Sequence, residues 1–470
     1  MPALRRCFLR SLKPQTRAPL LPLLVKELWE IFGGRAAWAM LLLLCPLVGF
    51  SFMEALRIYS EASSVAIGSP VMANSLSPLD GILVPTFGGF YVAVTLLFPF
   101  VAIRVLGGEK ESGAVRLLLQ LPYRVSTVIG IKLVAVGLAW FVAAGVACGS
   151  ALLAWLFFGG HLAGPELLNL LLGHGLYALL VGSIALFAAS LSDSSATAAI
   201  ITLAFTIGSW VLDFTTAGSS GFMGLVAHLS LTPTLRTFEG GLLSFGLVAG
   251  MIAAITGFCG LAAVWLPTGV PARKKMWRSA VCVAALGLTL GASGALRTTF
   301  DVTEDQRNSF ATADQWALAK LTGPLLITVH LAIEDPRYVD LRRNVLAKLE
   351  RAAPNVTVEI ADGLFSPRTG TSDERYGEVT YVYNRRTDAS RSTSPREILP
   401  LIYSLAGLAP PTQLSTPDYP GYPLVVTQTG PVWAWFFGGL PLLIALCWRW
   451  SRRTLDVRKM FKLEDTHAHA

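Results

Sequence analysis

The sequence predicts a polytopic α-helical membrane protein with about eight transmembrane helices and an α/β domain inserted between the last two spans. Of its 470 residues, 53% are apolar and only 14% are charged, a composition typical of chains that reside in a bilayer. Apolar runs approaching the roughly 20 residues that cross a hydrocarbon core of about 30 Å recur along the chain. Residues 297–431 interrupt them with shorter apolar patterns that indicate strands and helices.

Eight apolar runs qualify as spans. Spans such as 84–103, 242–266 and 279–296 contain no Asp, Glu, Lys, Arg or His, and His174 is the ionisable side chain that the sequence places well inside a span, where a hydrogen bond to a neighbouring helix is its ordinary role. Because ion pathways need such groups, a transporter driven by an ion gradient is not expected. The spans are 36–52, 84–103, 128–158, 168–191, 195–212, 242–266, 279–296 and 432–448, of which the first six form a core over 36–266.

Positive charge predicts the orientation of the spans. The net charge of +8 divides into −2 in the segment 297–430 and +10 in the rest of the chain, and loops that stay in the cytosol retain Lys and Arg. Only Arg57 and Arg236 depart from this alternation. We therefore expect both termini to be cytosolic and 297–431 to be periplasmic or extracellular. The basic regions are the arm 1–35, the region 104–132, the loop 267–278 and the tail 449–470.

The N-terminal arm is predicted to carry a helix that lies along the membrane surface before the first span. Lys26, Glu27 and Glu30 interrupt its apolar run, which does not fit a cleaved signal peptide. We expect Lys26 and Glu30 to point away from an apolar face. That face comprises Leu21, Leu24, Val25, Glu27, Leu28 and Phe32. The alternative is a frayed first turn of the span at 36–52.

No residue pattern points to catalysis, a metal or a cofactor bound by this chain. All six cysteines fall in spans or in the N-terminal cytosolic arm, so the exported domain is expected to fold without disulfides. The sequence holds no Gly-rich phosphate loop that ends in Gly-Lys-Ser/Thr. Small-residue pairs such as Gly145/Gly149, Gly246/Gly250 and Gly287/Gly291 favour close packing of helices.

The cytosolic loop 105–127, between the second and third spans, is the most distinctive segment. Two acidic residues stand where the N-terminus of a following short helix favours negative charge, and Pro122 stops that helix. We expect Val115, Leu118 and Leu119 to be exposed there and to bind a partner; the alternative is a surface helix with solvated charges. The pattern is Glu109-Lys110-Glu111-Ser112-Gly113, then Leu117-Leu118, Pro122 and, at the next span, Lys132.

This pattern resembles the coupling loop of type-two ABC exporter permeases, and the resemblance covers about 20–266, departing from the family pattern at Ala114 and Arg116. It implies that the loop docks on a separate ABC ATPase, present in two copies, which binds ATP and Mg, and that the permease pairs with a second copy or a homologue. The ATPase-coupling residues it implies are Glu109, Lys110, Glu111, Gly113, Leu117, Leu118, Pro122 and Lys132. It also implies that the protein resides in a bacterial inner membrane.

The segment 297–431 is predicted to be an α/β domain. Periodicity favours helices at 311–321, 335–353 and 396–408 and strands at 324–333, 356–360 and 378–384, followed by a proline-rich return at 410–423. Arg385, Arg386, Arg391 and Arg396 form a basic stretch, which suits a solvated face or contact with anionic lipid, glycan or peptide.

The opening of this domain, Asp301-Val302-Thr303-Glu304-Asp305, resembles the start of the accessory subunit of gliding-motility-type ABC systems. Together the two resemblances imply a non-enzymatic membrane subunit that exports an amphiphilic substrate or transmits force from its ATPase to the exported domain. Extracytoplasmic proteins are further expected partners, and nucleic acid is not. The alternative from another class is a membrane-anchored sensor or assembly scaffold whose exported domain binds a ligand.

Overall fold

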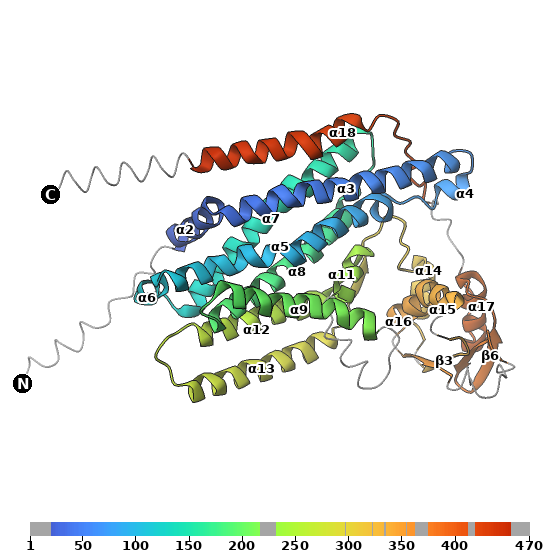
Figure 1. The fold of residues 1–470 in the computed structure, drawn as a ribbon. Coiled ribbons are helices and arrows are strands. Elements are labelled where there is room, and N and C mark those ends of the chain that lie inside the picture. The colour runs from blue at the N-terminus through green and yellow to red at the C-terminus, as the bar shows by residue number, and fades with distance from the viewer. Residues whose placement is uncertain are drawn as a thin grey trace, which may run out of the picture.

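The computed structural model describes residues 20–216, 232–296, 298–321, 323–332, 335–353, 355–361, 375–411 and 419–452. In these residues, eight helices are long and apolar enough to cross a membrane, and each contains or overlaps one predicted span. They form one elongated bundle, with a smaller α/β domain at one end (Figure 1). The eight are Arg35–Ala66, Leu79–Glu111, Val125–Phe157, Gly164–Leu191, Ser195–Leu212, Phe245–Trp265, Ala272–Gly294 and Gly430–Arg452.

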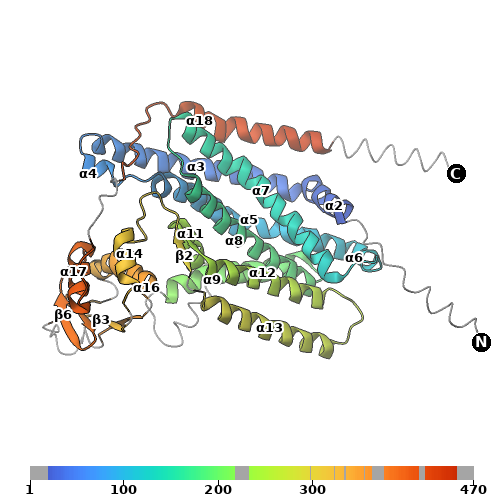
Figure 2. The same ribbon diagram turned by 180° about the vertical axis from the view of Figure 1, so that it is seen from behind.

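The remaining elements lie at the two ends of the bundle (Figures 1 and 2). Helices α2 (Leu20–Gly33) and α6 (Ala114–Leu118) define what we call the α6 end. The short helix α4 (Pro70–Ala73), the π-helical turn η1 (Leu79–Leu83) and α11 (Thr232–Glu239) lie toward the α/β domain, at the domain end. The helix Gly430–Arg452, which includes α18 (Gly430–Ala434) and η3 (Trp435–Gly439), runs beside α3 (Arg35–Ala66).

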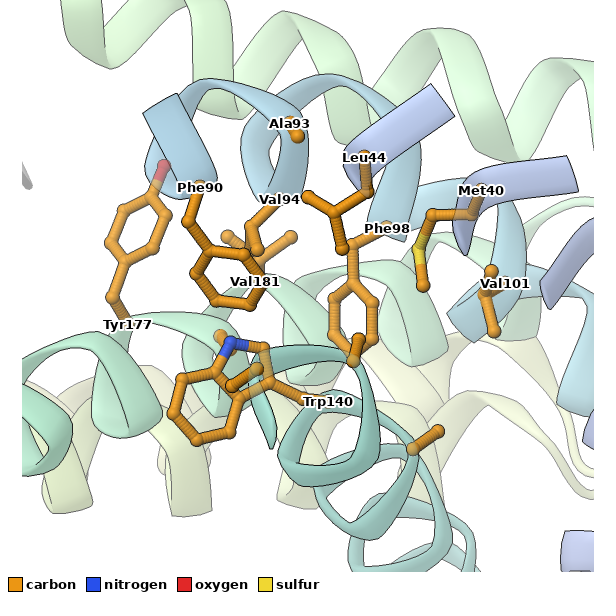
Figure 3. Close-up of a cluster of buried hydrophobic side chains, with 14 of the residues drawn as sticks. Met40, Leu44, Phe90, Ala93, Val94, Phe98, Val101, Trp140, Tyr177 and Val181 are labelled. Atoms are coloured by element: carbon orange, nitrogen blue, oxygen red, sulfur yellow. The ribbon is translucent and has the colours of Figure 1, made fainter. Parts of the chain in front are cut away.

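Helices α5 (Val84–Glu111) and α8 (Gly164–Leu191) form the centre of the bundle. Both contact α7 (Val125–Phe157) and α9 (Ser195–Thr216), and α8 also packs along α12 (Phe245–Trp265). Figure 3 shows the apolar core between α3, α5, α7 and α8, where Phe90 and Trp140 pack at 5.9 Å between ring centroids. By contrast, α13 (Ala272–Gly294) packs mainly on α12 and leaves most of its surface uncovered.

The first span is longer than predicted. The prediction ends it at residue 52 because charged residues follow, but α3 continues to Ala66. On that extension Arg57 pairs with Glu54 at 2.5 Å and with Glu61 at 2.7 Å, three and four residues apart. Helical spacing therefore lets the charges neutralise one another on an exposed face without ending the helix.

The α/β domain contains a four-stranded sheet in the order β4-β3-β5-β6. β3 (Leu325–Val329) is parallel to β4 (Val356–Ile360) and antiparallel to β5 (Val379–Tyr383), which confirms the three predicted strands. β6 (Arg386–Ser390) was not predicted; it pairs with β5 and takes up part of the basic stretch. The two residues between them, Asn384 and Arg385, have positive φ.

Helices cover one face of this sheet. They are α14 (Thr312–Leu318), the continuous run of α15 (Pro336–Leu341), η2 (Arg342–Leu346) and α16 (Ala347–Ala352), and α17 (Pro395–Ala406), in the three predicted places. Alternate residues of β3 and β5, such as Ile327 and Tyr381, are fully buried in the domain core. The domain thus has its own core, separate from that of the bundle.

The small-residue pairs differ in what they face. A Cβ on Gly246 would meet the carbonyl oxygens of Leu296 and Ser293 at 2.6 and 2.8 Å, so α12 packs closely against the end of α13 there. Gly145, Gly149, Gly287 and Gly291 have open space at the corresponding position. Only the Gly246/Gly250 pair therefore serves close packing inside the described chain.

This contrast gives a matched pair of variants. Gly246→Ala pushes a methyl group against two backbone carbonyls, so we expect it to lower the free energy of unfolding by about 1–3 kcal/mol. Gly287→Ala adds the same methyl group in open space and should leave stability unchanged or raise it by up to about 1 kcal/mol. Denaturant unfolding of the purified protein in detergent measures both, and equal midpoints would contradict the packing.

Candidate functional site

The predicted coupling loop forms the short helix α6 between α5 and α7. Gly113, with φ of 76°, lets the chain leave α5 and enter α6, a conformation that glycine adopts without steric cost. The prediction that Val115 and Leu118 are exposed is wrong: Leu118 packs against Leu23 of α2 and Val128 of α7. A helix of five residues has one inner and one outer side, and these two residues lie on the inner one.

The outer side of this segment presents a compact exposed surface. Leu117 is 68% exposed and Leu121 is 46% exposed, both unusually accessible for leucine. Arg116, Gln120 and Pro122 are exposed around them. We call these five residues the α6 surface; it offers two apolar side chains and one cation at the α6 end of the bundle.

Behind this surface lies a buried cluster of charges. The ammonium of Lys132, on α7, is fully buried and lies 2.8 Å from Glu27 Oε2 and 2.8 Å from Glu109 Oε2. It also donates a hydrogen bond to the carbonyl of Val105 at 2.9 Å. His174 is thus not the only buried ionisable residue of the spans, because Lys132 is enclosed just inside the start of α7.

Helix α2 contributes the other half of this cluster. Lys26 contacts Glu109 and lies 3.3 Å from Glu27 and 3.1 Å from Glu30. Burial raises the pKa of Glu27, against the attraction of Lys132, which lowers it. The prediction that Lys26 and Glu30 point away from an otherwise apolar face is therefore incomplete: the buried side of α2 consists of Leu23, Glu27 and Ile31, with Glu27 held by charge.

The next two residues of the motif tie α5 to the turn between α8 and α9. Lys110 Nζ donates to the carbonyls of Ala189, Ser190 and Ser192 at 3.1, 3.1 and 2.6 Å, at the C-terminus of α8. Glu111 accepts from the backbone N–H and hydroxyl of Ser195 at 3.1 and 2.6 Å, at the N-terminus of α9. Each charge thus lies at the helix end whose dipole favours it.

The structure therefore divides the predicted coupling residues into two groups. Glu109, Lys110, Glu111 and Lys132 make contacts inside the chain, whereas Leu117 and Pro122 lie on the α6 surface. Sequence reasoning missed Lys26, Glu27 and Glu30 as partners of this motif. The signal available in the sequence was the presence of these three charged residues within an apolar run, together with Lys132 within the apolar run of a span.

Three carboxylates of the cluster are close enough to suggest a metal site. Glu27, Glu30 and Glu109 each offer an oxygen, all within 4.8 Å of one another. The ammonium groups of Lys26 and Lys132 lie among these oxygens and already compensate them. A metal cation would have to displace those ammonium groups, so the geometry suits an ion-pair network.

Comparison with known families gives one match. Residues 21–230, slightly less than half of the chain, match the family model described as "ABC-2 family transporter protein". The matched segment runs from α2 past α9 and includes α6 and the whole charged cluster. No curated protein matches the chain. The match supports an ABC-2 type permease, that is, a membrane subunit of an ABC transporter.

The charged cluster predicts a large effect of one substitution. Lys132→Met removes the buried cation and leaves Glu27 and Glu109 close together, so we expect the free energy of unfolding to fall by about 3–5 kcal/mol. Adding Glu27→Gln should recover part of this loss because it removes one uncompensated charge. Denaturant unfolding in detergent provides the measurement.

Arg57→Met is the control for this prediction, since it removes a cation from an exposed network on α3 and should change stability little. An equal effect of Arg57→Met and Lys132→Met would show that burial of the cluster is unimportant.

Proposed function

We propose that this chain is the permease subunit of an ATP-driven ABC transporter and that a separate ATPase docks on the α6 surface. The observation that carries the proposal is that exposed Leu117 and Leu121 lie on or just after a short helix that packs, through Leu118, on the two helices that carry Glu27 and Lys132. When a partner covers exposed leucines, their apolar surface leaves water and the free energy of the complex falls. Because the charges of Glu27 and Lys132 hold several helices together, a force applied at the α6 surface would be transmitted to those helices.

ATP hydrolysis is assigned to the partner. The chain has no Gly-rich phosphate loop that ends in Gly-Lys-Ser/Thr, so this route to cradling nucleotide phosphates is missing. ATP and Mg would be bound by the ATPase, in two copies, and this chain would pair with a second copy or a homologue in a bacterial inner membrane. These assignments extend the resemblance to ABC-2 permeases.

The charged cluster supports a route for movement. A displacement of α6 acts on α5 through Gly113, on α2 and α7 through Leu118, and on α8 and α9 through Lys110 and Glu111. Such a movement would open a lateral path for an amphiphilic substrate or move the α/β domain, which we place outside the cytosol. In the gliding-motility-type accessory family that the domain opening resembles, such a domain accompanies the permease.

The docking assignment is tested with Leu117→Asp combined with Leu121→Asp. Neither side chain supports the fold, so we expect a folded protein that loses ATPase binding by about 1.5–3 kcal/mol for each leucine, roughly tenfold or more in affinity. Co-purification and stimulated ATP hydrolysis measure the loss.

Val65→Asp is the matched control, because Val65 is also an exposed apolar residue, at 67%, and lies near the C-terminus of α3, far from the α6 end. If the double variant binds the ATPase as well as Val65→Asp does, the α6 surface is not the docking site. If no ATPase binds the unaltered protein, the sensor or scaffold interpretation takes its place.

A further inference from the structure

The loop 301–309, which opens the α/β domain, has a compact internal structure. Its first residue, Asp301, accepts hydrogen bonds from the backbone N–H groups of Thr303 and Asn308 at 3.1 and 2.9 Å. The hydroxyl groups of Thr303 and Ser309 also donate to Asp301, at 2.5 and 2.9 Å. One carboxylate thus holds together both ends of the loop, which a passive tether would not require.

This loop is fixed to the start of α12. β2 (Thr299–Asp301) pairs with β1 (Leu242–Ser244), and Val302 N–H donates to the carbonyl of Gly241 at 3.0 Å. The side chain of Asn308 donates to the carbonyl of Gly240 at 2.7 Å. A Cβ on Gly241 would lie 2.1 Å from Thr303 Cγ2, so only glycine permits this approach.

The same loop contacts the first turn of α8. Glu166, which is only 4% exposed, accepts a hydrogen bond from the backbone N–H of Glu304 at 2.9 Å. The Glu304 carboxylate in turn accepts from the hydroxyl of Tyr422 at 2.5 Å and lies 2.9 Å from His161 Nε2. The rings of His161 and Tyr422 stack at 3.7 Å between centroids.

It also contacts the beginning of α5. The guanidinium of Arg307 pairs with Asp80, in the turn η1 that continues directly into α5, and with Asp305 at 2.9 Å. Arg307 is mostly enclosed, with 17% of its side chain exposed. Asp80 is 52% exposed, so solvent partly screens this pair, and the less exposed carboxylate of Asp305 also holds the guanidinium in place.

On its other side the loop enters the α/β domain. Arg351 of α16 donates to the carbonyl of Asn308 at 2.6 Å. Phe310, the residue after the loop, is buried in the domain core, where the ammonium of Lys348 lies 5.7 Å from its ring centroid. Movement of the loop therefore cannot occur without movement of α16.

We propose that loop 301–309 is the joint through which α5 and α8 move the α/β domain, with Asp80, Glu166 and Arg307 as its positioning residues. The two helices are joined at the α6 end by Lys110 and at the domain end by this loop. α5 alone, with 28 residues, is about 40 Å long. Sliding or tilting of α5 against α8 changes the relative positions of Asp80 and Glu166 and so reorients the loop.

This inference rests on the proposed docking of an ATPase at α6 and selects force transmission as its outcome. The test uses a variant without the six native cysteines, with spin labels at Ser64→Cys on α3 and Trp316→Cys on α14, both exposed. The label-to-label distance is measured by pulsed electron resonance in the complex with its ATPase, without nucleotide and after trapping with ATP and vanadate. We expect trapping to shift this distance.

The joint variant is Asp80→Ala with Glu166→Ala, which removes one contact to each helix and leaves α6 untouched. We expect it to retain ATPase binding and stimulated hydrolysis but to lose most of the distance shift, and Asp80→Glu alone to keep the shift. Glu54→Ala, which breaks an exposed pair on α3, is the control and should behave as the unaltered protein. A loss of fold in the joint variant would lower ATPase binding as well, which separates it from uncoupling.

The outcomes distinguish the two proposals. ATPase binding and hydrolysis without any distance shift in the unaltered complex would overturn the joint and leave the permease assignment intact. A joint variant that shifts as the unaltered protein does would also overturn the joint. No binding of the ATPase would overturn both proposals. If the joint variant misfolds, Arg307→Lys decides: it keeps the charge but not the two-sided contact, and an undiminished shift would count against the joint.

Discussion

The structure depends on the requirement that the buried ammonium of Lys132 be compensated without water. A lysine enclosed among apolar helices is tolerated only when anionic groups and hydrogen-bond acceptors surround it. Glu27, Glu109 and the carbonyl of Val105 supply them, from α2 and α5. Three helices are therefore brought together at one point, and α6 packs on two of them, α2 and α7, through Leu118.

This constraint explains how charged residues are accommodated beside the apolar spans. At the α6 end, Lys132 links α7 to α2 and α5, and Lys26 links α2 to α5. Lys110 and Glu111 continue the same arrangement toward α8 and α9, where they meet helix termini of opposite polarity. The exposed network around Arg57 contrasts with them, since it links residues of one helix and positions no neighbour.

The centre of the bundle and the α/β domain are related by continuity of the helices. α5 and α8 are the most enclosed spans, and each extends from the charged cluster to the loop 301–309. The outer helix α13 has few such contacts, so its role is peripheral to this connection. The two central helices are thus attached to other elements at both ends of the bundle.

The sequence by itself determined the eight spans, because crossing a bilayer requires length and apolarity that are visible locally. It also determined most elements of the α/β domain, whose strands and helices alternate with their own periods. β6 was not predicted, since Arg386–Ser390 contains no apolar residue larger than alanine and forms a strand by pairing with β5. Only the tertiary structure decided that Glu27, Glu109 and Lys132 form one cluster, because ion pairs between residues so distant in the chain leave no periodic signal. The coupling-loop motif could be recognised from the sequence, but the partners of its residues decide which of them face inward.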